Sequence, residues 1–395
     1  AAQFEMTGLI VDALIGTGLD NLLDEQWADA VRQINDSQAP VISVDIPSGL
    51  DANTGSVQGV AVRADDTMTF IAQKQGMYVS DARAYCGEIN FASLGVPEEL
   101  YQQVEHSAFL LEWNKLVIDY PVRNPASSKT EHGHLLIIGG DLGMAGACRI
   151  AGEAALRAGV GLVSIATRPE NVTAITSSRP ELMVHGIETG DDLVPLLKRA
   201  TTIAIGPGLG TRQWGVELLA KIIAVLENPE LFNESNTPYQ CVMDADALNI
   251  IAKNDWVIEN NNVIYTPHFG EATRLLKYPS PRPDSKTDRF SMINALAQHY
   301  GGIFILKGAG TMISREHDIA ICPYGNEGMS SAGMGDCLTG IIGALLAQNI
   351  SLAKAADIGV CLHAKAGDLT AKEGKNGMLV SDLFPSIRCL INTAP

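Results

Sequence analysis

Residues 328–336 have the sequence GMSSAGMGD and run directly into an apolar segment. Glycine lets a ligand approach the backbone closely, and the N–H groups at the start of a helix attract an anion. The segment therefore predicts an anion-binding loop at a helix N-terminus. Asp336, at the end of the loop, would lie beside the anion, where a carboxylate can act as a base. The alternative is a glycine-rich turn in which Asp336 only stabilises the first turn of a core helix.

A second candidate loop, KGAGT at residues 307–311, follows an apolar run typical of a buried strand. Its ammonium, hydroxyl and backbone N–H groups can bind phosphate oxygens. A simple hairpin turn with an exposed Lys307 is the alternative. Because residues 333–336 also predict an anion site, we favour a site for nucleotide phosphates formed by both loops.

His268 and Glu271 lie three residues apart after another apolar run. This spacing places both side chains on one side of a first helical turn, which suits contact with a substrate better than metal binding. A lone histidine is often structural, so His268 ranks below Asp336. Asp244 and Asp246 flank a predicted helix start, and for them we place helix capping slightly ahead of function.

Asp12 and Asp45 stand near the ends of two short apolar runs, and each is followed by a turn that contains glycine. Ligands of open α/β sheets collect where parallel strands end, so the two aspartates suggest a site. Equally, they could satisfy the N–H groups of the turns.

Parallel strands must position these loops. Residues 9–15 and 41–46 read as strands joined by a helix at residues 22–35. From His134 onwards, apolar runs repeatedly end in polar or glycine-rich loops, which in a parallel sheet line one crevice. Between these regions, residues 105–129 lose their period and predict a linker, with packing on a surface as the alternative because the segment is moderately apolar. The charged, proline-rich residues 279–289 predict solvated surface.

Composition narrows the class of protein. The 395 residues are 46% apolar and carry a formal net charge of −17. The negative charge argues against a nucleic-acid partner, and no apolar run is long enough for a membrane span. The seven cysteines form no CxxC pair, and no secretory leader is visible, so we expect reduced thiols and a cytoplasmic protein.

In combination, several motifs resemble the ADP-dependent NAD(P)HX dehydratases of the ribokinase-like superfamily. The motifs are IIGGDLGMAGA (137–147), GPGLG (206–210), DADALN (244–249), TPHFGE (266–271), KGAGT and GMSSAGMGD. The first part of the chain is similar to the NAD(P)HX epimerase domain that is fused to the dehydratase in bifunctional bacterial enzymes. There the matching motifs are VDALIGTGL (11–19), SVDIPSGLD (43–51) and TFIAQKQGM (69–77).

The resemblance implies an α/β protein in which a partial Rossmann-like domain precedes a three-layer α/β/α dehydratase domain. We expect the epimerase-like domain at residues 1–111, a linker at 112–128 and the dehydratase at 129–395. The family repairs NADH and NADPH whose nicotinamide ring has been hydrated. Its epimerase interconverts the two epimers, and its dehydratase restores the coenzyme at the expense of ADP.

For the dehydratase, the resemblance implies that Asp336 is the catalytic base, that Mg²⁺ accompanies the phosphates, and that two sets of residues bind ligands. The nucleotide residues are Lys307, Gly308, Ala309, Gly310, Thr311 and Gly335. The NAD(P)HX residues are Ala145, Gly208, His268 and Asp336.

For the epimerase-like domain, the resemblance implies a K⁺ site at Asp12 and Ser48. The implied coenzyme residues are Gly16, Thr17, Gly18, Leu19, Asp20, Asn21, Leu22 and Asp45. The family has a further half-domain upstream that supplies another K⁺ ligand, so we expect this K⁺ site to be incomplete and leave the epimerase activity open. A homo-oligomer is expected. A ribokinase-like kinase for a small hydroxymethyl compound or sugar, and a non-catalytic nucleotide-binding module, are the alternatives.

Overall fold

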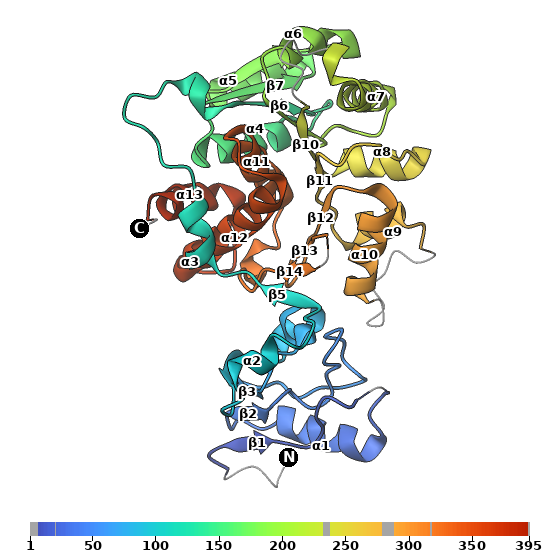
Figure 1. Ribbon diagram of the computed structural model, residues 1–395, viewed down its shortest axis with the longest axis vertical. Helices are drawn as coiled ribbons and strands as arrows, with labels where there is room; N and C mark the ends of the chain where they lie inside the picture. The colour runs from blue at the N-terminus through green and yellow to red at the C-terminus, as the bar shows by residue number, and fades with distance from the viewer. Residues whose placement is uncertain (1–6, 20, 232–237, 279–287, 317, 394–395) are drawn as a thin grey trace.

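The computed structural model describes residues 7–19, 21–231, 238–278, 288–316 and 318–393. Two units are visible, each built on its own sheet (Figure 1). The first unit contains strands β1 to β4 and lies at the bottom of the view in blue. The second unit contains strands β5 to β14 and forms the larger body above it.

The sheet of the first unit is parallel, in the order β1-β2-β3-β4. Its strands are β1 (Ile10–Asp12), β2 (Val41–Val44), β3 (Asp66–Phe70) and β4 (Glu88–Ala92). Helix α1 (Glu25–Asn35) joins the first two strands, and Val31 and Ile34 pack with Ile10 and Val41. The predicted strand, helix and strand are thus confirmed. The helix starts later than predicted because the Asp24 side chain caps it by accepting the Trp27 N–H.

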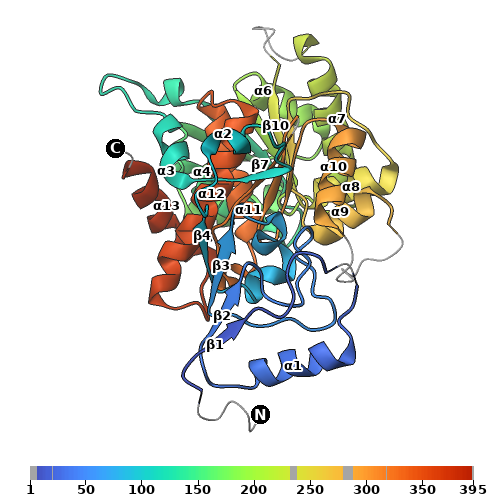
Figure 2. The ribbon, with the colours of Figure 1, turned by 60° about the horizontal axis from the view of Figure 1, so that its bottom comes forward.

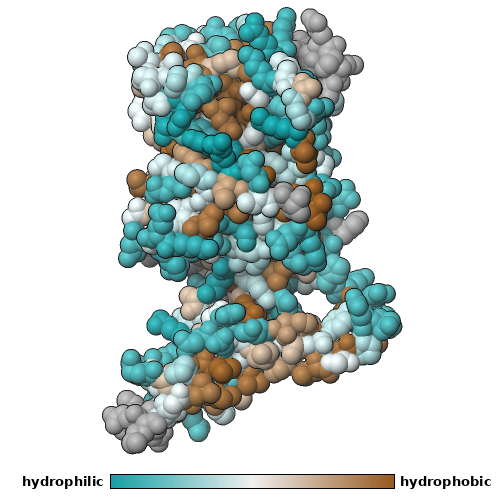
Figure 3. Space-filling model, turned by 90° about the vertical axis from the view of Figure 1, so that its left-hand side faces the viewer, coloured by the Kyte–Doolittle hydropathy of each residue, from teal (hydrophilic) through white to brown (hydrophobic). Residues whose placement is uncertain are grey.

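Figure 2 shows α1 near the β1 end of this sheet. The opposite face of the sheet carries Val11, Val44 and Met68, which are all exposed, Val11 by 60%. Hydrophobic side chains are visible over the lower unit in Figure 3. No described residue covers this face.

Within the described residues, the sheet of the second unit has the order β5-β14-β13-β12-β11-β10-β9-β6-β7-β8. All of its neighbouring strands are parallel except β13, which runs antiparallel to β12 and β14. The strands are β5 (Ala108–Leu110), β6 (His134–Ile138), β7 (Leu162–Thr167), β8 (Met183–Gly186), β9 (Thr202–Ile205), β10 (Gln240–Met243), β11 (Val263–Tyr265), β12 (Ile303–Leu306), β13 (Met312–Ser314) and β14 (Ile319–Ile321).

Helices cover both faces of this sheet (Figure 1). One layer contains α4 (Ala145–Arg157), α11 (Met334–Ala347), α12 (Leu352–Thr370) and α13 (Leu383–Asn392). The other contains α7 (Gln213–Glu227), α8 (Asp246–Asn254), α9 (Phe269–Leu275) and α10 (Arg289–Tyr300). Side chains of β6 alternate between the layers, with Leu135 and Ile137 in the first core and Leu136 and Ile138 in the second. The expected three-layer α/β/α architecture is confirmed.

The described residues also contain the short α-helices α2 (Glu98–Tyr101), α3 (Trp113–Leu116), α5 (Val172–Ser178) and α6 (Val194–Leu197). Strand β5 lies within predicted domain 1–111, yet it pairs with β14. Trp113, Val117 and Tyr120, from the predicted linker, are buried in the core of the second unit. The two predicted domains are therefore joined by packed structure.

No helix among the described residues has the length and apolar character needed to cross a membrane. All seven cysteines are free thiols, and only Cys389 is exposed. The expectation of unpaired thiols is thus met.

Candidate functional site

The loops singled out in the sequence follow neighbouring strands. β9, β10, β11 and β12 are adjacent and parallel, so their carboxyl ends share one edge of the sheet. The loops that follow them are residues 206–210, 244–249, 266–271 and 307–311. Backbone hydrogen bonds join neighbouring loops, as where the Lys307 N–H donates to the Pro267 carbonyl at 2.9 Å. The expected grouping of these loops along one edge is confirmed.

Helix α11 begins at this edge with the glycine-rich segment. Gly333 caps it with a φ of 88°, a left-handed conformation that glycine adopts without strain. Asp336 lies in the first helical turn. Further along, a Cβ on Gly340 would lie only 2.0 Å from the Ala151 carbonyl oxygen, so α11 and α4 touch through their backbones. This close contact fixes the first turn of α11 relative to α4.

A buried ion pair lies next to this turn. Lys307 Nζ is 2.7 Å from Asp244 Oδ1, and the Thr339 hydroxyl donates to Asp244 Oδ2 at 2.8 Å. Burial opposes ionisation of Asp244, but the Lys307 charge and the hydrogen bonds outweigh it and lower the pKa of Asp244. The pair holds the ammonium group beside Gly335, where a Cβ would lie 3.3 Å from Nζ.

Asp336 lies close enough to this pair to have an altered ionisation. Burial, reinforced by repulsion from the Asp244 carboxylate, raises the pKa of Asp336 to about 7, although the Lys307 charge opposes the rise. A carboxylate whose pKa lies near neutrality can both take up and release a proton at ordinary pH. Asp336 therefore has the ionisation expected of a general base.

His268 and Glu271 form a capping box at the start of α9. His268 Nδ1 accepts the Gly270 N–H at 2.9 Å, and the Glu271 carboxylate accepts the His268 N–H at 2.8 Å. Burial and the Lys307 charge lower the pKa of His268, which keeps the ring neutral. Burial also raises the pKa of Glu271 to about 7. The predicted placement in a first helical turn is confirmed, and His268 has a structural role there.

Helix capping is the wrong interpretation for Asp244 and Asp246. The N-cap of α8 is Ala245, and no side chain caps this helix. Asp244 pairs with Lys307 instead, and Asp246 Oδ2 accepts the Gly210 N–H at 2.9 Å. Both carboxylates thus bind groups from other loops of the same edge.

A cavity of about 850 Å³ opens beside the first turn of α11. Its volume is in the range usual for small-molecule sites. The cavity is lined by all six residues expected to bind the nucleotide: Lys307, Gly308, Ala309, Gly310, Thr311 and Gly335. His363 from α12 also lines it, and among the described residues its buried Nε2 has no hydrogen-bond partner. Burial lowers the pKa of His363 to about 4, so its imidazole ring is neutral beside the cavity.

Residues 307–311 form the turn between β12 and β13, and Arg289 stabilises this turn by hydrogen bonds to its backbone. Arg289 Nη1 donates to the Ala309 carbonyl at 2.7 Å, and Nη2 donates to the Leu306 carbonyl at 3.0 Å. Arg289 is only 7% exposed, and burial lowers the pKa of its guanidinium group to about 10. The expectation of solvated surface is therefore wrong for Arg289, whereas residues 279–287 lie outside the described part of the chain.

Two of the expected coenzyme residues lie together. Ala145 is the first residue of α4, and a Cβ on Gly208 would lie 2.8 Å from Met144 Cβ, immediately before it. His268 lies instead beside Lys307, with which it forms a β-bridge.

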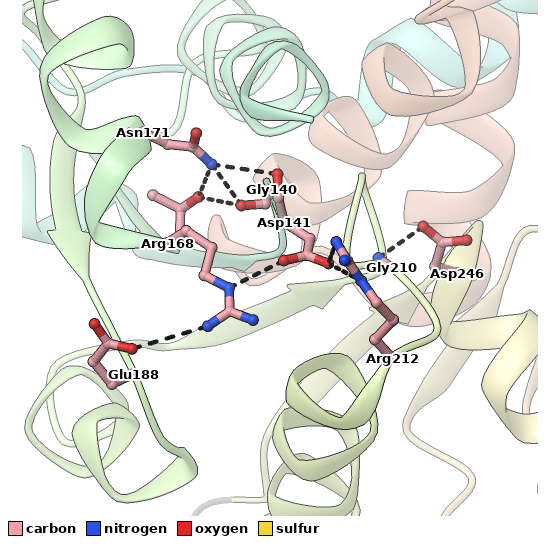
Figure 4. A network of polar contacts seen from close by, with 9 residues as sticks. Gly140, Asp141, Arg168, Asn171, Glu188, Gly210, Arg212 and Asp246 are labelled. Carbon is pink, nitrogen blue, oxygen red and sulfur yellow. Dashed lines mark hydrogen bonds and ion pairs between the residues drawn. The ribbon is translucent and has the colours of Figure 1, made fainter. Parts of the chain in front are cut away.

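A charged network borders the two loops that carry Ala145 and Gly208 (Figure 4). Asp141 is 3% exposed and accepts hydrogen bonds from Arg168 Nε at 3.0 Å and Arg212 Nη2 at 2.9 Å. Burial opposes ionisation of Asp141, but its hydrogen bonds and the two arginines lower its pKa. The network ties the loop after β6 to the loop after β9, and Asp246 continues it through Gly210.

Asp12 and Ser48 meet in the first unit. The Ser48 hydroxyl donates to Asp12 Oδ1 at 2.6 Å, and the Ser43 hydroxyl donates to Oδ2 at 2.8 Å. Asp12 is 1% exposed, and within the described residues no cationic side chain pairs with it. The Ile15 carbonyl lies 3.1 Å from the Ser48 hydroxyl. This group of hard oxygen atoms around a buried negative charge is suited to an alkali-metal ion.

Asp45 adopts a φ of 71°, a conformation that costs energy in a residue other than glycine and that is common at functional sites. Its carboxylate pairs with the Lys74 ammonium group and accepts the Phe70 N–H at 3.1 Å. The expected coenzyme loop at residues 16–22 is a largely exposed turn after β1, and Asp20 within it lies outside the described residues.

Arg289 and His363 do not stand out among the sequence motifs. Arg289 acts through carbonyl groups at least 17 residues away, and neither residue belongs to a glycine-rich motif. A signal did exist for His363, because it is a polar residue within an apolar stretch of α12.

Comparisons with known proteins agree with this geometry. The profile of the NAD(P)H-hydrate dehydratase family matches residues 135–388, and that of the YjeF-related protein N-terminus matches residues 1–76. A bifunctional NAD(P)H-hydrate repair enzyme from Coxiella burnetii is 44% identical over 97% of this chain and 76% of its own length. The corresponding enzyme from Escherichia coli is 44% identical over 98% of this chain and 72% of its own length.

Solved structures support the fold. A ribokinase-like superfamily protein from Enterococcus faecalis superposes with a TM-score of 0.64 at 23% identity, covering 74% of this chain and 98% of its own. The ADP/ATP-dependent NAD(P)H-hydrate dehydratase from Bacillus subtilis, co-crystallised with ATP and Mg²⁺, has a TM-score of 0.61 at 25% identity, covering 72% and 98%. Because an epimerase-type region at residues 1–76 is followed by a dehydratase region at residues 135–388, and the bifunctional relatives match nearly the whole chain, the chain belongs to the family of bifunctional NAD(P)H-hydrate repair enzymes.

Proposed function

We propose that residues 129–395 form an ADP-dependent dehydratase that converts (6S)-NAD(P)HX back to NAD(P)H, with Asp336 as the base. The observation that carries the proposal is the position of Asp336. It directly follows Gly335, which lines the cavity, and its pKa is raised to about 7 beside the Lys307–Asp244 pair. The B. subtilis dehydratase with ATP and Mg²⁺ supports the choice of nucleotide.

In this mechanism Asp336 takes the proton from the hydroxyl group of the hydrated nicotinamide ring. The hydroxyl oxygen forms a bond to the terminal phosphorus of ADP, and the bond from that phosphorus to AMP breaks. Phosphate then leaves the ring with the C–O bonding electrons, and loss of a ring proton restores the double bond. Lys307 and the N–H groups at the start of α11 offset the negative charge that develops on the phosphoryl group.

We assign the two ligands to two sets of residues. Residues 307–311 and His363 would bind the nucleotide, because they line the cavity. Ala145, Gly208 and His268 would contact the hydrated coenzyme. Mg²⁺ would be held chiefly by the phosphates and water, since the described residues contain no cluster of three metal-ligating His, Cys, Asp or Glu side chains.

The decisive test is Asp336→Asn. We expect this variant to lose ADP-dependent recovery of reduced-nicotinamide absorbance while it still binds ADP, because the amide keeps the shape of the carboxylate but cannot accept the proton. Turnover and calorimetric ADP binding should be measured on the same preparation. Substantial activity in the variant would exclude Asp336 as the base, and a wild-type protein inactive on (6S)-NADHX with ADP would exclude the dehydratase assignment.

We further propose that residues 1–111 retain the K⁺-binding corner of the epimerase fold at Asp12 and Ser48, and that residues 112–128 connect the two functional domains. If this oxygen cluster binds K⁺ specifically, K⁺ should raise the melting temperature of the full chain more than Na⁺ does. Asp12→Asn should remove the difference, and equal melting temperatures in the two salts for wild type would contradict the K⁺ assignment.

A further inference from the structure

The nucleotide cavity has a wall that the second unit does not supply. The second unit contributes the turn at residues 307–311 and the segment at residues 324–330. The first unit contributes the 3₁₀ helix η2 (Ser80–Ala84), through Ser80, Asp81, Arg83 and Ala84. The cavity is therefore built between the two units.

Backbone contacts hold this wall in place. The Ser80 N–H donates to the Ala309 carbonyl at 3.0 Å. Gly310 passes so close to the first unit that a Cβ on it would lie 1.9 Å from the Tyr78 carbonyl oxygen. The turn expected to bind phosphates thus contacts the first unit with no side chain between them.

Arg83 crosses from one unit to the other. Its Nη1 donates to the Pro323 carbonyl at 2.7 Å, and its Nη2 donates to the Gly325 carbonyl at 3.1 Å. These carbonyls place the guanidinium group at the start of the cavity-lining segment at residues 324–330.

Arg83 has hydrogen-bonding capacity left over. A guanidinium group has five N–H donors, and the two contacts to carbonyls use two of them. No carboxylate among the described residues forms an ion pair with Arg83, although Asp81 lines the same wall. A half-buried cation with free donors at a cavity wall suits oxygen atoms of a phosphate or ribose. The exposed Asp81 carboxylate suits ribose hydroxyl groups.

We propose that the first unit completes the nucleotide site, with Arg83 donating hydrogen bonds to oxygen atoms of bound ADP. This inference rests on the proposed function, which places ADP in the cavity. It gives the first unit a part in dehydration that is separate from any epimerisation, and it makes nucleotide binding a link between the two units.

The test compares ADP binding by calorimetry in the full chain and four variants. Arg83→Gln removes the cation, and Ala84→Trp leaves Arg83 intact but adds bulk at the wall. Arg32→Gln is the matched control for charge, since Arg32 lies on α1 and pairs with Glu25 outside the cavity. Ala126→Trp is the control for bulk, since Ala126 is exposed and outside the cavity.

We expect the Kd for ADP to rise about tenfold or more in Arg83→Gln, because this variant loses a charge-assisted hydrogen bond. The Kd should rise at least as much in Ala84→Trp. The KM for ADP should rise in parallel, and both controls should match wild type. If either cavity variant melts like wild type and binds ADP within about twofold of it, the inference is wrong. Wild-type protein that neither binds nor uses ADP would instead refute the proposed function itself.

Discussion

Asp336 is a carboxyl group that titrates in the range where enzymes are usually assayed. Burial and the neighbouring Asp244 charge raise its pKa to about 7, so below that pH most molecules hold a proton on the proposed base. A protonated carboxyl group cannot accept the substrate's proton. Activity should therefore fall as the pH drops through this value and level off above it.

This pH dependence can be measured as kcat/KM between about pH 5 and pH 9 at saturating ADP. We expect a rise to a plateau with half of the maximal value near pH 7. Glu271 titrates in the same range, so Glu271→Gln is the control and should retain the rise. A flat profile in wild type would exclude a base that titrates near pH 7, and a rise that disappears in Glu271→Gln would assign the titration to Glu271 instead of Asp336.

The partners of single residues are what the sequence predicted least well. The loops that contain Asp336, Lys307 and His268 can be predicted because they contain glycine or proline. For Asp244, local spacing slightly favours capping over function, because its partners Lys307 and Thr339 lie 63 and 95 residues away in the sequence. Local spacing contains no information about such contacts, whereas it predicts helix starts and turns well.

Helices α4 and α11 bring together the loops at their N-terminal ends, and glycine makes this contact possible. Gly340 lies against the Ala151 carbonyl oxygen with no room for a Cβ. Gly146 lies near the start of α4, and a Cβ there would meet no atom within 4 Å. The two glycines therefore offer a matched pair for testing the helix contact.

Gly340→Ala should separate the helices and lower the free energy of unfolding by about 2 kcal/mol or more, the usual cost of overpacking a core. It should also reduce turnover, because the first turn of α11 carries Asp336. Gly146→Ala should leave stability unchanged or slightly higher, since alanine favours a helix. Urea unfolding and the repair assay check both variants, and equal stabilities would show that the contact is not tight.

Periodicity predicted the repeated strands and the loops after them, because buried parallel strands read as short apolar runs. β13 returns antiparallel beside β12, as the hairpin alternative for residues 307–311 predicts, but Lys307 in this turn is largely buried instead of exposed. Periodicity does not predict which side chains of residues 113–120 pack on the second unit. The linker prediction followed from prolines and serines near residues 121–128, and these gave no sign of Trp113 or Val117 in the core.

The molecule as a whole is more continuous than two separate domains would be. The first unit contacts the second through Arg83 and through the backbone beside Gly310, and the chain then continues into β5 of the second unit, which pairs with β14. Both contacts between the units lie at the nucleotide cavity. Motif spacing could assign the two halves to their families, but only the fold shows that they meet at this cavity.

Strand β5 also shields the second unit from other copies of itself. Without it, β14 would be the outermost strand, and the Ile321 carbonyl that now accepts the Leu111 N–H at 2.9 Å would be unpaired. A shortened chain that starts at residue 112 should therefore associate through this open edge, whereas one that starts at residue 105 should remain dispersed. Light scattering of the two would decide, and equal dispersion would contradict this role. Separating the halves at their family boundary thus carries a risk of self-assembly through β14.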